Sequence, residues 1–192
     1  MFERSRLSLT MGVLAAILGA GVGSAGAQDN GPRTDAVIAT FSGSPVNVRQ
    51  RTCEGQDGTY LEIRGLSTGE IASSDPRLSG DLEYTAEPAR LNLTTGLGTF
   101  RGRFRVVDPD TGALKAEGEF HTVITEGRLN HGLALGKVAN PRPGAADNFV
   151  ATFKSTFDAE FNVTGQLGGA GDPRTPAVVQ GGHCRGAFVK VP

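Results

Sequence analysis

Alternation of polar and apolar residues over residues 98–123 is the feature that most constrains the fold. A repeat of two residues is that of a β-strand, because successive side chains point to opposite faces. Between the two alternating runs lies "PDTGA", residues 109–113, where Gly112 can take the left-handed conformation that closes a three-residue loop. The segment therefore predicts a hairpin with these pairs on one face: Arg105 with Glu117, Arg103 with Glu119 and Arg101 with His121.

The two faces of this hairpin differ in character. One carries opposite charges, and the other sets Phe104 against Gly118 and Phe120 against Gly102. We expect the charged face to meet solvent, since exposed pairs of this kind stabilise a sheet only slightly. The alternative is that the charges face a ligand.

The rest of the chain shows the same period, and no stretch after the first 27 residues sustains a helical period of 3.6. Residues 149–167 alternate most clearly, with phenylalanines on one face, and predict a long strand bent near Ser155 or Gly165. Gly and Pro interrupt the chain at "SGSPVN", "ASSDP", "NPRPGAAD" and "GGAGDPRTP". About eight strands in one domain indicate a sandwich or a barrel. We expect an all-β fold with a single antiparallel, roughly eight-stranded β-barrel.

The first 27 residues read as an export signal. Arg4 and Arg6 precede an apolar run, and "AGA" at 25–27 supplies small residues for cleavage. A retained membrane anchor is the alternative, although the run is short for a membrane span. We expect residues 1–27 to be removed, residues 28–34 to be flexible and residues 35–192 to form the barrel, in a secreted or periplasmic protein.

The two cysteines, Cys53 and Cys184, predict one disulfide in such a compartment. The bridge would join the first and last parts of the fold, which a closed sheet allows. The alternative is two free thiols, one of them a nucleophile.

His131 is the most informative polar residue of the next predicted hairpin, which turns at Glu126 and Gly127. A two-residue loop would bury Leu129, Leu133 and Leu135 and place His131 inward, opposite Thr122. An inward histidine is either a hydrogen-bonded core residue or a ligand contact and candidate catalytic proton-transfer group. The second role predicts other inward polar groups nearby, with Ser155 and Tyr84 as candidates.

Composition excludes several classes of partner and site. The formal net charge is −1, and no basic stripe or charge run predicts nucleic-acid or membrane binding after signal cleavage. The three histidines are not spaced as metal ligands, so we expect no metal and no cofactor. "GLSTG", residues 65–69, matches a nucleophile elbow, but its flanks predict that Ser67 lies in a turn.

The stretch "LTTGLGTFRGRFRVVDPDTGALKAEGEF", followed by "GLALGKV", resembles allene oxide cyclase-like barrels and the related dirigent barrels. The resemblance covers residues 59–138. It implies an eight-stranded barrel with an apolar cavity, a reactive and largely apolar substrate, and a homo-oligomer. The catalytic residues of that family have no matching positions here.

Three functions follow from these observations. The first is an exported barrel that binds a small, largely apolar molecule without catalysis. The second is a cyclase or isomerase that holds its substrate in a reactive shape, and the third is an extracellular interaction module. For the first, the candidate ligand-binding residues are Phe100, Phe104, Phe120, Phe149, Phe153, Phe157 and His131. An interior space of several hundred Å³ would favour the first two, and a filled interior would favour the third.

Overall fold

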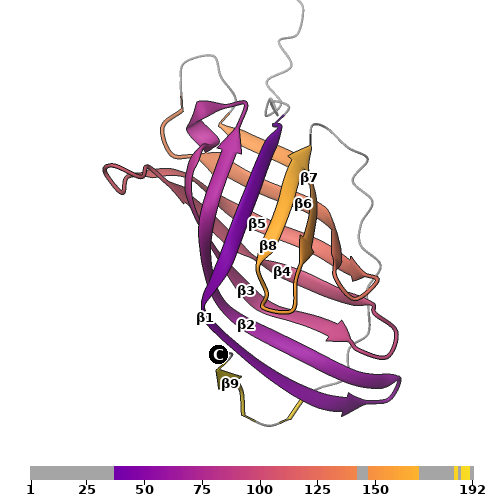
Figure 1. Cartoon of the computed structure of the whole chain (residues 1–192). Coiled ribbons are helices and arrows are strands. Elements are labelled where there is room, and N and C mark those ends of the chain that lie inside the picture. Colours follow the sequence, from indigo (N-terminus) through magenta and orange to yellow (C-terminus); the bar gives the residue numbers. More distant parts are fainter. Residues whose placement is uncertain (1–36, 142–146, 169–183, 186, 191–192) are drawn as a thin grey trace, which may run out of the picture. The chain divides into compact units, whose positions relative to one another are not determined.

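The computed structural model describes residues 37–141, 147–168, 184–185 and 187–190 (Figure 1). The predicted signal peptide, the flexible segment 28–34 and most of the predicted last strand lie outside these residues. Nine strands form one antiparallel sheet: β1 Ala39–Gly55, β2 Gly58–Ser73, β3 Gly80–Asn92, β4 Gly98–Val107, β5 Leu114–Thr125, β6 Leu129–Val138, β7 Asn148–Phe157, β8 Val163–Gly168 and β9 Val189–Lys190.

The sheet closes on itself. Strand β1 pairs with β2 along its length and with β8 over Ala39 to Gly43, so β1 to β8 form a closed barrel. The two-residue strand β9 pairs with β1 at Arg49 and Gln50. The predicted all-β, eight-stranded barrel is confirmed, as is the disulfide between Cys53 and Cys184.

The only helical element among the described residues is the 3₁₀ turn η1, Pro76–Leu78, at the top of Figure 1. Asp75 caps η1 by accepting a hydrogen bond from the Arg77 amide at 2.9 Å. Leu78 is buried and closes one end of the barrel interior. In the described part of the chain, no helix is both apolar enough and long enough to cross a bilayer.

Strands β4 and β5 pair in the predicted register. Arg103 lies opposite Glu119 and Phe104 opposite Gly118. The charged face is outside, where the Arg103 side chain is 75% exposed. The loop is longer than predicted, because a register shift before Val107 pairs that residue with Leu114. Gly112 has the expected positive φ of 69°.

The predicted long strand over residues 149–167 is wrong. It is a hairpin in which β7 pairs with β8, Ser155 opposite Gly165. The turn is organised by Asp158, whose side chain accepts from the amides of Glu160 and Asn162 at 3.0 and 2.8 Å. Both strands keep their apolar residues inward, so the alternation continues across the turn and hides it in the sequence.

The predicted register of β5 and β6 is also wrong, by one residue. Thr125 pairs with Leu129, which leaves a three-residue loop with positive φ at Glu126 and Gly127. His131 therefore lies opposite Val123 on the outer face and is exposed. The interior explains the shift: phenylalanines from neighbouring strands occupy it, so β6 turns its small residues and Val138 inward and its leucines outward. Leu135 is 37% exposed.

Candidate functional site

Aromatic rings fill the centre of the barrel. Phe120 packs against Phe100, Phe153 and Tyr84, with ring centroids 4.7, 5.5 and 6.4 Å apart. Phe104 and Phe149 are 6.1 Å apart. Five of the six predicted ligand-binding phenylalanines are thus buried inside: Phe100, Phe104, Phe120, Phe149 and Phe153. The sixth, Phe157, is half-buried and stacks on Phe161 at 6.4 Å.

Several of the large interior rings lie over a glycine of a neighbouring strand. A Cβ atom at Gly118 would lie 2.7 Å from the Phe104 ring, and one at Gly102 would lie 2.8 Å from the Phe120 ring. These separations are far below van der Waals contact, so the rings occupy the space that side chains would need. The predicted pairing of phenylalanine with glycine is confirmed, and it explains how one interior holds so many rings.

Two small cavities remain between the rings. The first, of about 40 Å³, is bounded by Leu78 at the end that η1 closes. The second, of about 50 Å³, lies toward the other end and is lined by Ile63, Ala89, Phe157 and Phe161, among others. Pockets for drug-sized molecules measure roughly 300–1,000 Å³, so the interior is largely filled.

Tyr84 stands between the two cavities and lines both. Its side chain reaches from β3 to β1, where Gly43 leaves room: a Cβ atom at Gly43 would lie 2.9 Å from the hydroxyl. Tyr84 is only 8% exposed, and its hydroxyl has no hydrogen-bond partner among the described residues. Burial raises the pKa of Tyr84, and a weaker interaction with the Ser67 hydroxyl lowers it. That interaction falls outside normal hydrogen-bond geometry, so it does not satisfy the Tyr84 hydroxyl.

The other interior polar groups are better satisfied. The Thr122 hydroxyl donates to the carbonyl of Phe100 at 2.8 Å. The Asn130 amide donates to the Ser155 hydroxyl at 2.9 Å, although Asn130 Oδ1 has no partner in the described part of the chain. Of the polar residues predicted to face inward, Ser155 and Tyr84 do so. Asn130 occupies the interior position predicted for His131, one residue along.

The predicted role of His131 loses its basis, because an outward imidazole cannot contact a molecule inside the barrel. Ser67 also differs from expectation: it lies within β2, buried opposite Tyr84, and not in a turn. The glycines around it gave the appearance of a turn. Gly65 instead lies at a bulge in the pairing of β2 with β3, where its φ is 155°.

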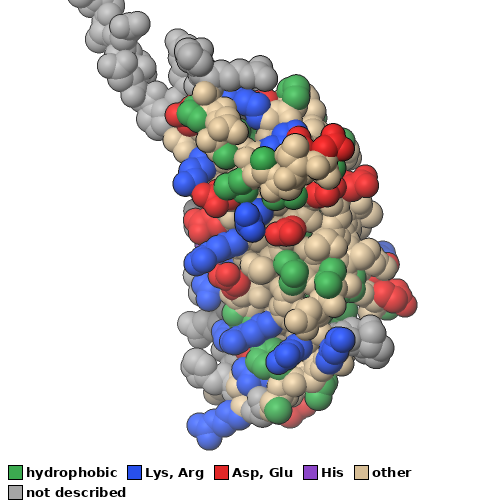
Figure 2. Space-filling model, turned by 90° about the vertical axis from the view of Figure 1, so that its left-hand side faces the viewer, with side chains coloured by type: hydrophobic (Ala, Val, Ile, Leu, Met, Phe, Trp, Pro, Cys, Tyr) green, Lys and Arg blue, Asp and Glu red, His purple; other side chains and the backbone are tan. Residues whose placement is uncertain are grey.

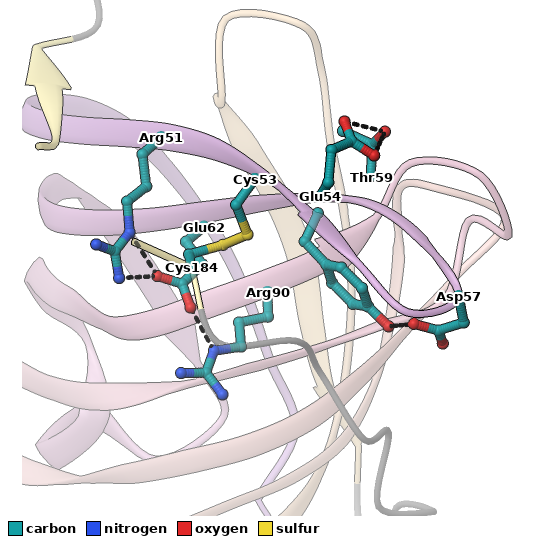
Figure 3. The surroundings of a disulfide bond; sticks show 9 residues. Arg51, Cys53, Glu54, Asp57, Thr59, Glu62, Arg90 and Cys184 are labelled. Atoms are coloured by element: carbon teal, nitrogen blue, oxygen red, sulfur yellow. Dashed lines mark hydrogen bonds and ion pairs between the residues drawn. A yellow bond between two sulfur atoms is a disulfide. The ribbon is translucent and has the colours of Figure 1, made fainter. Parts of the chain in front are cut away.

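A second buried polar group lies on the outer face, beneath the segment that carries Cys184 (Figure 3). Glu62 is 0% exposed and accepts from Arg51 Nε and Nη2 at 2.8 and 2.6 Å, and from Arg90 Nε at 2.7 Å. Phe188 covers Arg51, whose guanidinium carbon is 4.4 Å from the ring centroid. This cluster was not predicted. The only signal was that Arg49, Arg51 and Cys53 share one face of a strand.

Within the described ranges, no group of three or more His, Cys, Asp or Glu side chains could hold a metal ion. The comparisons with known proteins add no assignment: no family model, curated protein or solved structure matches this chain. The resemblance of residues 59–138 to allene oxide cyclase-like and dirigent barrels therefore stays a prediction. What is established is a closed barrel with a buried aromatic cluster, an architecture compatible with ligand binding.

Proposed function

We propose that this chain is an exported barrel that binds a small, largely apolar molecule around Tyr84. The observation that carries the proposal is the unpartnered Tyr84 hydroxyl between two apolar cavities. A buried hydroxyl without a partner costs about 1–3 kcal/mol, and a ligand atom that accepts its proton would recover that cost. The ligand is thus mostly hydrocarbon with one hydrogen-bond acceptor, such as a carbonyl or ether oxygen.

The cavities set the size of this ligand. Each has room for a group of only a few non-hydrogen atoms. A longer molecule would need rings that line the second cavity to move. Phe157 and Phe161 are suited to this, because both line that cavity and are only half-buried. The disulfide is in keeping with an oxidising compartment and supports the export part of the proposal.

The test is native mass spectrometry of protein secreted by its own source, followed by binding measurements with whatever co-purifies. We expect a retained apolar molecule that binds about tenfold more weakly to Tyr84→Phe, which loses one hydrogen bond but keeps the ring. Tyr60→Phe is the matched control, because Tyr60 lies on the outer face and should leave affinity unchanged. An unoccupied wild-type protein that also binds no small ketone, ester or ether would contradict the proposal.

A second candidate is the extracellular interaction module, which the filled interior favours. Its supporting observation is the outward turn of the β6 leucines, which leaves apolar side chains on the barrel exterior. Cyclase-type catalysis has no comparable support, since the one residue that motivated it lies outside the barrel.

A further inference from the structure

Three basic side chains lie next to one another on the outer face, at the end of the molecule that carries the disulfide. Arg64 on β2 pairs with Arg49 on β1, and Arg49 pairs with Lys190 on β9. Directly paired residues of antiparallel strands point to the same side of the sheet, so the three side chains form one row. All three are exposed. We call Arg64, Arg49 and Lys190 the basic row.

The basic row has no acidic partner among the described residues. The nearest carboxylate on the same strands, Glu62, is fully buried and already bound by Arg51 and Arg90. Like charges placed opposite each other destabilise a sheet. The row therefore contrasts with the outer face of β4 and β5, where Arg103 and Arg105 each lie within 4 Å of a glutamate, at 3.8 and 3.7 Å.

Covalent and aromatic contacts hold the row in place. Lys190 comes from the far end of the chain and is positioned by the Cys53–Cys184 bridge and by the pairing of β9 with β1. Phe188, in the same segment, lies under Arg64 as well, with 4.9 Å between the guanidinium carbon and the ring centroid. A surface that is ordered before binding loses less conformational entropy when a partner arrives.

In the view of Figure 2, Lys and Arg side chains are more frequent in the lower part of the molecule, whereas acidic side chains lie mainly higher. Such a field attracts a polyanion despite a formal net charge of only −1 for the chain. Adjacent strands are about 4.8 Å apart, so the row spans roughly 10 Å.

We infer that the basic row binds an acidic polysaccharide. A short run of carboxylated sugars places anionic groups along a line, as the row requires. An anionic membrane fits less well, because the exposed apolar neighbour of Lys190, Val189 (59% exposed), points to the opposite side of β9 from the row. A nucleic acid fits less well too, since Phe188 is covered by two guanidinium groups and is not free to stack on bases.

The experiment measures fluorescence anisotropy of a labelled polygalacturonate oligomer with the oxidised full-length protein. We expect saturable binding that weakens from about 50 to 200 mM salt. The double variant Arg49→Gln/Arg64→Gln should bind at least about tenfold more weakly. The matched control Arg103→Gln/Arg105→Gln removes the same charge from the mixed face and should bind like the wild type, as should Tyr84→Phe.

Three results would overturn the inference: no binding of the oligomer, equal losses in the two double variants, or stronger binding to phosphatidylglycerol vesicles or single-stranded DNA than to the oligomer. Thermal unfolding of each variant accompanies the measurement. In the Arg49→Gln/Arg64→Gln protein, relief of the repulsion between the two arginines and loss of the Arg64–Phe188 contact act in opposite directions, so its unfolding temperature should stay close to that of the wild type. Lost binding then reports on the surface and not on folding.

Discussion

The two tyrosines of this chain lie in two contrasting regions. On the outer face, the Tyr60 hydroxyl is buried and donates to Asp57 at 2.5 Å, close to the equally well-bonded Glu62. Inside the barrel, the Tyr84 hydroxyl is buried without a partner. Buried polar groups that serve only the fold are normally paired, and the proposed ligand site rests on this difference between the two tyrosines.

The largest expected effect comes from the aromatic interior. Phe120→Ala should lower the free energy of unfolding by about 3–5 kcal/mol, because Phe120 touches three other rings and its loss leaves a cavity. Urea unfolding followed by circular dichroism measures the change. Leu135→Ala, on the partly exposed outer face, is the control and should cost about 1 kcal/mol or less. Similar losses for both would show that the rings do not form the core.

Substitutions on the outer face should lower the stability less than substitutions in the aromatic interior. Glu62→Gln should lower the free energy of unfolding by about 2 kcal/mol, since two guanidinium groups lose a charged acceptor while remaining partly solvated. Arg103→Gln, which removes only an exposed and distant ion pair, should change stability by less than about 0.5 kcal/mol. A Glu62→Gln protein as stable as the wild type would mean that the cluster contributes nothing.

Alkaline pH should lower the free energy of unfolding, because both tyrosines then lose their protons. Burial raises the pKa of Tyr84, and the hydrogen bond to Asp57, with burial, raises the pKa of Tyr60. The folded state then holds these protons more tightly than the unfolded chain, whose tyrosines titrate near about 10. Stability should therefore be complete below pH ~10 and fall as pH rises above it. Tyr84→Phe should make the fall shallower, and an unchanged slope would contradict the assigned burial.

The sequence predicted the parts of the fold that depend on local patterns. Alternation with a turn at "PDTGA" predicted the pairing of Phe104 with Gly118, and two cysteines predicted the bridge that joins β1 to a distant segment of the chain. The sequence-based prediction failed where the register of a strand pair depends on residues from other strands of the barrel. Nothing local to Glu126 and Gly127 shows that rings from β4, β5 and β7 already fill the interior, and this filling turns His131 outward.

In the candidate site, too, features set by a local pattern were predictable, and features set by distant strands were not. The phenylalanines were predictable from their period of two, whereas the unpartnered state of the Tyr84 hydroxyl depends on what β1 and β2 place around it. Gly43 and Ser67 supply those surroundings from positions far along the chain, and neither was expected inside a strand. The Glu62 cluster was missed because it needs three strands and a distant segment to assemble.

The Tyr84 hydroxyl is buried in the barrel interior without a hydrogen-bond partner. Unfolding free energies of ligand-free Tyr84→Phe and Tyr60→Phe, measured in urea beside the wild type, test it most directly. We expect opposite signs: Tyr84→Phe should be more stable than the wild type by about 1 kcal/mol, and Tyr60→Phe less stable by about the same amount. A Tyr84→Phe protein destabilised as much as Tyr60→Phe would show that the Tyr84 hydroxyl has a partner within the chain.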